Sequence, residues 1–212
     1  MPYQTSSPES LSDAQLVIDA TGVNAKTIEI TPMVDGYLQS NPAISALRRG
    51  NLMARSRMII LYDQSVEFEA LVTGTGNKTE YLLGYTTLYG DAACAFNPVG
   101  DLYKTQVRQL SRVMGMPERI INKLPSADLW AGQTDEGEMG FSYEDVDQLL
   151  YMLIEERFTV QECIAAGISE AFVHRVVSMI NRNAFKRKLP PVARITPLQV
   201  GADWVYPPEL AL

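Results

Sequence analysis

The sequence predicts an α/β fold that closes with a helical C-terminal third. Over the first half of the chain, segments with helical periodicity alternate with short β-branched segments, which is the rhythm of α/β proteins. A glycine-rich turn, residues 74–76, directly follows the second β-branched segment, and open α/β sheets bind ligands at such positions. After residue 141 we find only helical patterns before a basic, proline-containing tail. A chain of 212 residues, 46% of them hydrophobic, can bury a sizeable core, so we expect a single domain over residues 1–212.

The first half of the chain predicts two helix–strand pairs. An amphipathic helix begins after Ser7, carries Pro8 in its first turn and runs to Gly22. The alternating segment 26–30 then predicts a strand, which Thr31-Pro32 ends. The second pair is a long helix from about residue 43 to residue 62 and a strand over residues 69–73.

The second half predicts mainly helices. Residues 105–114 form the first, and residues 124–140 lack any regular period, so we expect a long loop there. Ser142 and Thr159 each precede an acidic residue by three positions and an apolar run, which is the pattern of a helix start. A last helix contains the apolar spacing of residues 173–180.

Composition excludes several classes of protein. A net charge of -7 argues against a broad basic surface for nucleic acid. No apolar run approaches the roughly 20 residues that cross a bilayer, and the first residues lack the features of a signal peptide. Cys94 and Cys163 have neither disulfide nor zinc spacing. We expect a cytoplasmic protein that binds neither nucleic acid nor membrane.

The turn after the second predicted strand is a candidate nucleotide site. Gly74-Thr75-Gly76 offers unpaired N–H groups and a hydroxyl to phosphate or ribose, although an ordinary turn would have the same residues. Glu80 follows early in the next helix and could share Mg²⁺ with phosphate oxygens. It could equally be a solvated first-turn glutamate that the helix dipole stabilises.

Basic residues give weaker signals. Lys104 opens a helix and suits either a phosphate contact or the surface, and the only histidine, His174, lacks triad partners, so we expect it to be structural. Four arginines crowd the helix over residues 43–62, where they suit an anion site or a solvated face: Arg48, Arg49, Arg55 and Arg57.

Several motifs, taken in order, resemble the NAD synthetase family over nearly the whole chain. They are Arg49-Gly50-Asn51, Gly74-Thr75-Gly76-Asn77-Lys78, Tyr89-Gly90-Asp91, Asn97-Pro98, Leu102-Tyr103-Lys104, Pro125-Ser126-Ala127-Asp128, Gln133-Thr134-Asp135-Glu136 and Lys186-Arg187-Lys188-Leu189-Pro190-Pro191. Several motifs in order are far more specific than any one of them. The resemblance implies a partial doubly wound parallel sheet of the adenine-nucleotide alpha-hydrolase-like type.

The resemblance also implies a ligase reaction in two steps. The carboxylate of deamido-NAD attacks the α-phosphorus of ATP and releases pyrophosphate, and ammonia then displaces AMP from the acyl-adenylate to give NAD. The family uses Mg²⁺ and forms homodimers. Ammonia arrives free or from an upstream glutaminase domain, and the residues leave both sources open.

The resemblance assigns a separate role to each matching residue of this site. By resemblance Thr75, Lys104 and Ser126 bind ATP, Glu80 binds the metal, Arg55, Phe185 and Lys186 bind deamido-NAD, Asp91 lies near the ammonia position, and residues 124–140 form a lid. Three positions depart from the family pattern. Phe185 stands where histidine is frequent, Leu88 where many members carry lysine, and Ala95 at a frequent aspartate position.

The largest departure from the family pattern is a missing phosphate-binding loop. Family members begin the domain with a strand and a Ser-Gly-Gly-x-Asp-Ser loop, and these 212 residues contain no such loop. We therefore expect that the native gene product is longer at its N-terminus or that this chain is a fragment. The alternative is a noncatalytic remnant that acts as a binding or dimerisation subunit. A related enzyme such as GMP synthetase is disfavoured by Tyr89-Gly90-Asp91 and by the lid motif.

Overall fold

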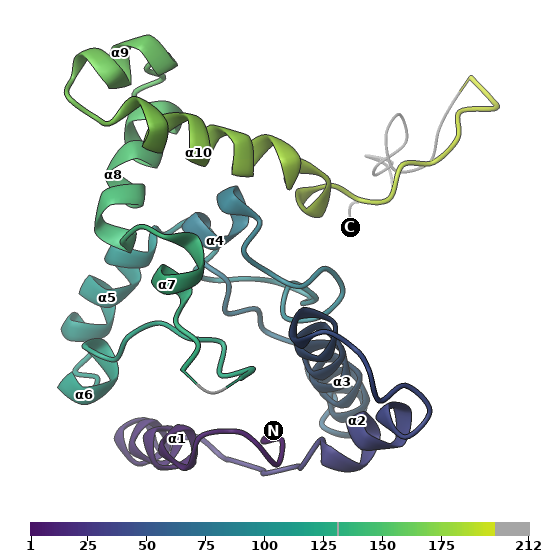
Figure 1. The fold of residues 1–212 in the computed structure, drawn as a ribbon. Coiled ribbons are helices and arrows are strands. Elements are labelled where there is room, and N and C mark those ends of the chain that lie inside the picture. The colour runs from purple at the N-terminus through teal and green to yellow at the C-terminus, as the bar shows by residue number, and fades with distance from the viewer. Residues whose placement is uncertain (131, 198–212) are drawn as a thin grey trace, which may run out of the picture.

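Helices and long connecting loops make up residues 1–130 and 132–197, which the computed structural model describes (Figure 1). The helices are α1 Pro8–Thr21, α2 Thr31–Leu38, α3 Ala46–Glu67, α4 Lys78–Leu83, α5 Lys104–Val113, α6 Glu118–Ile121, α7 Asp135–Met139, α8 Tyr143–Ile154, α9 Val160–Ala165, α10 Glu170–Arg182 and the 3-10 helix η1 Ala184–Arg187. None of the helices in this part of the chain has the length and apolar character needed to cross a membrane.

The predicted helix starts are confirmed by their caps. Ser7 accepts a hydrogen bond from Glu9 N at the start of α1, and Ser142 accepts one from Asp145 N at the start of α8. Thr159 forms the expected capping box at α9. These caps satisfy N–H groups that have no partner within the helix, which is why the sequence pattern locates them well.

The strand predictions fare differently. In the described residues the ladder pairing is a single parallel bridge between Thr73 and Phe96, with Gly74 N donating to Phe96 O at 2.8 Å. Residues 26–30 have no strand assignment, so the strand predicted there is wrong for this structure. An extended segment becomes a strand only beside another that pairs with it, and the described residues place no such neighbour against residues 26–30. The doubly wound sheet therefore stays a prediction.

The structure adds one helix that the sequence did not predict and corrects the extent of one loop. Thr31 and Pro32 begin α2, because proline is favoured in the first turn of a helix, where its missing N–H has no partner to lose. Residues 124–130 and 132–134 are irregular as predicted, but α7 occupies residues 135–139 of the expected loop. Thr134 caps that short helix by accepting a hydrogen bond from Gly137 N.

Two hydrophobic clusters position the functional residues. The larger cluster lies among α4, α5 and α7–α10, with Tyr143 and Leu149 fully buried in it. The smaller one packs Tyr3, Ile30 and Val34 against Met53 of α3. Figure 1 shows α2 and α3 on one side and α5, α8 and α9 on the other, with the loops at residues 71–77 and 84–103 between them.

Candidate functional site

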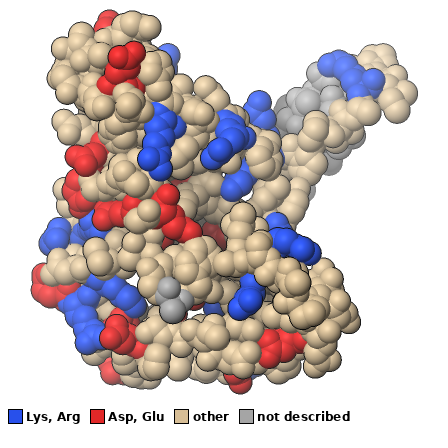
Figure 2. All heavy atoms as spheres, viewed as in Figure 1, with Lys and Arg blue, Asp and Glu red and all other residues tan. Residues whose placement is uncertain are grey.

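A cavity of about 980 Å³ lies between the two clusters. Its walls come from α3, α5, the loops at residues 72–75 and 84–93, and the irregular segment that leads to α7. Figure 2 shows charged groups of both signs on the face of the molecule seen there, and no broad basic surface. A concave site of this size suits a small-molecule ligand.

Thr75 lines the cavity from the glycine-rich turn. The turn lies close against residues 94–97, because a Cβ at Gly74 would come within 2.6 Å of Cys94 Sγ and 3.1 Å of Asn97 Cβ. Asn97 also donates to Gly76 O, which fixes the turn on its other side. Gly74 is therefore required by close approach, as expected of a turn that presents its backbone and hydroxyl to a ligand.

Glu80 lies in the first turn of α4, and its carboxylate also forms part of the cavity wall. Its Oε2 accepts a hydrogen bond from Asn77 N at 3.0 Å, which completes a capping box at the start of α4. Its Oε1 lies 3.0 Å from Lys104 Nζ inside the cavity wall. Glu80 is thus a first-turn capping residue and a cavity carboxylate at once.

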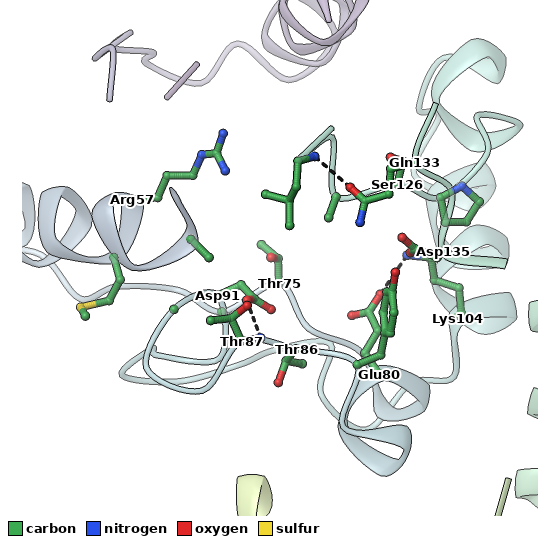
Figure 3. Close-up of a pocket in the computed structure, with 18 of the residues that line it drawn as sticks. Arg57, Thr75, Glu80, Thr86, Thr87, Asp91, Lys104, Ser126, Gln133 and Asp135 are labelled. Atoms are coloured by element: carbon green, nitrogen blue, oxygen red, sulfur yellow. Dashed lines mark hydrogen bonds and ion pairs between the residues drawn. The ribbon is translucent and has the colours of Figure 1, made fainter. Parts of the chain in front are cut away.

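Lys104 is held at the start of α5 with its ammonium toward Glu80. Its backbone N donates to Thr79 Oγ1 at 3.0 Å, and its Nζ lies 5.2 Å from the centre of the Tyr143 ring. Figure 3 shows Glu80, Lys104 and Asp135 grouped at one end of the cavity. A lysine fixed between a carboxylate and an aromatic face can offer its charge to a phosphate that enters the cavity.

Asp135 was given no individual role from the sequence beyond its place in the predicted lid. Asp135 is 5% exposed, its Oδ2 accepts a hydrogen bond from Tyr143 OH at 3.0 Å, and its Oδ1 has no hydrogen-bond partner. Burial raises the pKa of the Asp135 carboxyl. Tyr85, whose pKa is also raised by burial, donates to Glu138 on the same wall. The only sequence signal for Asp135 was its place in the lid motif.

Asp91 and Lys186 lie at another part of the cavity. Thr87 N donates to Asp91 Oδ1 at 2.8 Å, and burial raises the pKa of the Asp91 carboxyl. Lys186, on η1, donates to Gly84 O and Thr86 O at 2.7 Å each, while burial lowers its pKa. Figure 3 shows Asp91 and Thr75 pointing into the same space.

Ser126 enters the cavity from the irregular segment. Its Oγ accepts a hydrogen bond from Asp128 N at 3.1 Å. Asp128 is tied to the first helix, since its Oδ2 accepts from Ser7 N at 3.1 Å and from Ser10 Oγ at 2.9 Å. The segment that carries Ser126 is thereby anchored to α1.

The structure brings six of the eight predicted site residues into one cavity, and two stay outside its lining: Arg55 and Phe185. Arg55 is exposed and donates to Leu88 O at 3.2 Å, and the Phe185 side chain is 58% exposed. Arg57, two positions along α3 from Arg55, lines the cavity instead, and burial lowers its pKa. Periodicity alone did not determine which arginine faces inward.

The expected metal site is represented by a single carboxylate. Among residues 1–130 and 132–197 no group of three or more His, Cys, Asp or Glu side chains is arranged to hold a metal ion. Glu80, which the resemblance assigned to the metal, lines the cavity.

Comparison with known proteins identifies the family. A family model described as NAD synthase matches residues 1–190. The NH(3)-dependent NAD(+) synthetase of Chlorobaculum parvum is 53% identical over 206 residues, which cover 97% of this chain and 74% of that protein.

Two solved structures share the fold. An NMN synthetase from Francisella tularensis superposes with a TM-score of 0.80 at 32% identity, covering 92% of this chain and 76% of that one. An NH3-dependent NAD synthetase from Campylobacter jejuni, in complex with nitrate, gives a TM-score of 0.75 at 33% identity over the same shares. Family model, sequence identity and fold agree, and the chain belongs to the NAD synthase family.

Proposed function

We propose that this protein amidates deamido-NAD to NAD at the expense of ATP, through an acyl-adenylate. The observation that carries the proposal is the cavity, because it gathers six residues that the family resemblance had assigned to ATP, metal, deamido-NAD and ammonia. The high identity to a curated NH(3)-dependent NAD(+) synthetase supports the same reaction. That agreement disfavours a noncatalytic remnant.

The first half-reaction needs the negative charge of ATP to be held in place. Thr75 and Ser126 approach the cavity from two different loops, and Lys104 offers an ammonium from the start of α5. In the proposed reaction a carboxylate oxygen of deamido-NAD forms a bond to the α-phosphorus, and the bond to pyrophosphate breaks. Holding both nucleotides in line and excluding water would supply most of the acceleration.

Glu80 is the proposed ligand for Mg²⁺. One carboxylate combined with phosphate oxygens is a donor set that Mg²⁺ accepts, so the residues present fit the metal. When bound, the ion would neutralise phosphate charge. Lys104 pairs with Glu80 Oε1, and we propose that the ammonium leaves that oxygen when a metal ion binds there, because two cations on one oxygen repel each other.

The second half-reaction is proposed to take place near Asp91. Ammonia attacks the carbonyl carbon of the acyl-adenylate, the bond to the AMP oxygen breaks, and one proton of the incoming nitrogen must be removed. Asp91 lines the cavity and its carboxylate is held by Thr87 N, so it could accept a hydrogen bond from ammonium or ammonia. Lys186 lines the same cavity, where we propose that it contacts deamido-NAD.

Arg55 and Phe185 need a different proposal. Since neither lines the cavity, we propose that they contact the distal part of deamido-NAD outside it. Arg55→Ala and Phe185→Ala should then raise the KM for deamido-NAD while the KM for ATP stays unchanged. Equal changes in both KM values would argue against this assignment.

A second candidate function follows from the similarity to an NMN synthetase. The same chemistry on nicotinate mononucleotide would give NMN, and the choice between the two acids depends on whether the site binds the second nucleotide of deamido-NAD. Release of AMP should be measured with deamido-NAD, nicotinate mononucleotide and xanthylate, with ammonium or glutamine as nitrogen donor. We expect the highest kcat/KM with deamido-NAD and ammonium. AMP formation with xanthylate alone would contradict the proposal.

Three broader features stay proposals. We propose that the two clusters and the cavity belong to one synthetase domain, that the protein is a homodimer and that it is cytoplasmic. A sedimentation experiment tests the second, because a dimer of 23.5 kDa chains has twice the mass of the monomer. Activity with glutamine but not with ammonium would point to a glutaminase partner instead of free ammonia.

A further inference from the structure

Asp135 carries an unusual feature for a buried carboxylate. It is 5% exposed, and Oδ1 has no hydrogen bond of normal geometry although Oδ2 accepts from Tyr143 OH. The Tyr85 hydroxyl, which also acts on this carboxyl, donates to Glu138. Buried polar atoms are nearly always paired, and a carboxylate oxygen without a donor is costly to keep. An oxygen of this kind in a cavity wall is expected to acquire a partner at some stage of function.

Lys104 is a cation whose position suits that partnership. Its Nζ lies over the ring of Tyr143, and the hydroxyl of the same ring donates to Asp135. The charge of Lys104 is felt at Asp135, where it opposes the rise in the carboxyl pKa that burial causes. Glu80, the present partner of Lys104, acts on Asp135 in the opposite sense, so the three groups form one electrostatic unit.

We propose that Asp135 is a positioning residue for Lys104, and that Asp135 Oδ1 pairs with the Lys104 ammonium when a cation takes Glu80. Lys104 would then have two alternative carboxylate partners and would stay charged, desolvated and directed at the phosphates in both. This inference rests on the proposed roles of Glu80 and Lys104 in the synthetase reaction.

The inference accounts for two observations together. A metal ion at Glu80 would otherwise leave Lys104 without a carboxylate partner beside a new positive charge, which would drive its flexible side chain away from the phosphates. The location of Asp135 at the first position of α7, after the irregular segment, means that Lys104 can adopt the second arrangement only when that segment is in place. Phosphate positioning and placement of the segment are thereby coupled.

The direct test is the reactivity of the Lys104 amine toward an acylating reagent, followed by mass spectrometry in the absence of any ligand. An ammonium held by a carboxylate is a poor nucleophile. The variants are Glu80→Gln, Asp135→Asn and the double variant. Gln can keep the capping contact with Asn77 N, and Asn can keep the contact with Tyr143 OH, so both changes remove charge with little change of shape.

The expected pattern is non-additive. Each single variant should acylate at Lys104 within about threefold of wild type, whereas the double variant should react at least about tenfold faster, the scale of one charged hydrogen bond. Lys78, which pairs with Glu155 and Asp101 away from the cavity, is an internal reference in every sample and should not change. If Glu80→Gln alone raises the acylation rate of Lys104 by about tenfold, Asp135 is not its second partner. This single variant therefore tests the proposal even if the double variant does not fold.

A second readout uses ATP and a double-mutant cycle. Asp135→Asn should weaken binding of Mg-ATP about tenfold in the wild-type background and have no further effect in Lys104→Met, because a residue that acts through Lys104 loses its effect once that amine is gone. Equal losses in both backgrounds would show a structural role and overturn the proposal. The acylation test needs no substrate, so a failed synthetase assignment would leave its outcome readable.

Discussion

Gly50 of α3 lies directly against Leu129 of the segment that carries Ser126: a Cβ at Gly50 would approach Leu129 Cδ1 to 2.8 Å. Leu129 is also held by its own segment, since its N donates to Gln133 Oε1 at 2.8 Å. Because Gly50 has no side chain, Leu129 can pack against the backbone of α3, and this contact positions one wall of the cavity. This relationship connects a helix motif with a loop that is far away in the sequence.

Gly50→Ala should disturb that wall. The added Cβ would meet the end of the Leu129 side chain, which can rotate, so the overpacking cost should lie at the low end of about 1–3 kcal/mol and roughly cancel the helix-propensity gain of about 0.5–1 kcal/mol. We therefore expect little change in the free energy of unfolding in urea but a higher KM for ATP, because Leu129 has to shift. Gly36→Ala on α2 is the matched control, because nothing lies within 4 Å of its Cβ, and it should be neutral or slightly stabilising. Identical behaviour of the two variants would show that the close approach has no consequence.

Gly84→Ala should be far more harmful than Gly22→Ala. Both glycines end a helix with positive φ, 67° and 69°, so both substitutions carry a backbone cost of about 1–2 kcal/mol. At Gly84 the added Cβ would also come within 2.2 Å of Asn183 Cβ, whereas at Gly22 it meets nothing within 4 Å. We expect Gly84→Ala to unfold at lower urea concentration than Gly22→Ala. It should also displace Lys186, which donates to Gly84 O.

The sequence predicted what is decided locally and missed what is decided by long-range contact. The caps at Ser7, Ser142 and Thr159 depend on residues two or three positions apart, and all are confirmed. The strand over residues 26–30 depends on a neighbour that pairs with it, which β-branched alternation cannot supply. The local preference of residues 26–30 for an extended backbone was therefore not sufficient to make them a strand.

The site shows the same division. Motifs in order led to Thr75, Glu80 and Lys104, and the structure places all three on one cavity. Asp135 escaped attention because its significance lies in burial and in an unpaired oxygen, neither of which a sequence displays. Arg57 was missed because the sequence does not show which face of α3 lies against the cavity.

Glu80→Gln should lower turnover at least about tenfold at limiting magnesium, because an amide oxygen is a weaker Mg²⁺ ligand than a carboxylate. The amide can keep the capping box, so the free energy of unfolding should change by less than about 1 kcal/mol. Glu162→Gln makes the same substitution in the capping box of α9, away from the cavity, and should leave turnover unchanged. If Glu80→Gln shows wild-type turnover at limiting magnesium, Glu80 is not the metal ligand.

Asp91→Asn should change how stability depends on pH. Burial raises the pKa of Asp91 above its ordinary value of 3.8 in the folded protein, so below that value both folded and unfolded states are protonated and the residue contributes nothing. As the pH rises from there towards the raised pKa, the unfolded chain ionises first and wild-type stability falls. The variant cannot ionise, so it should gain stability relative to wild type over this window. Urea unfolding between pH 3.5 and neutrality measures the free energy of unfolding of both proteins. If the two plots of free energy against pH are parallel, the pKa of Asp91 is not raised in the folded protein.

The central claim is that a carboxylate of deamido-NAD is adenylated in this cavity, and an isotope experiment tests it most directly. Deamido-NAD labelled with ¹⁸O in its nicotinate carboxylate is incubated with ATP, Mg²⁺ and ammonium, and the products are analysed by mass spectrometry. Our account predicts NAD that retains one labelled oxygen, AMP that carries the other, and loss of both products in Lys104→Met. AMP without label, formed alongside unchanged deamido-NAD, would contradict it.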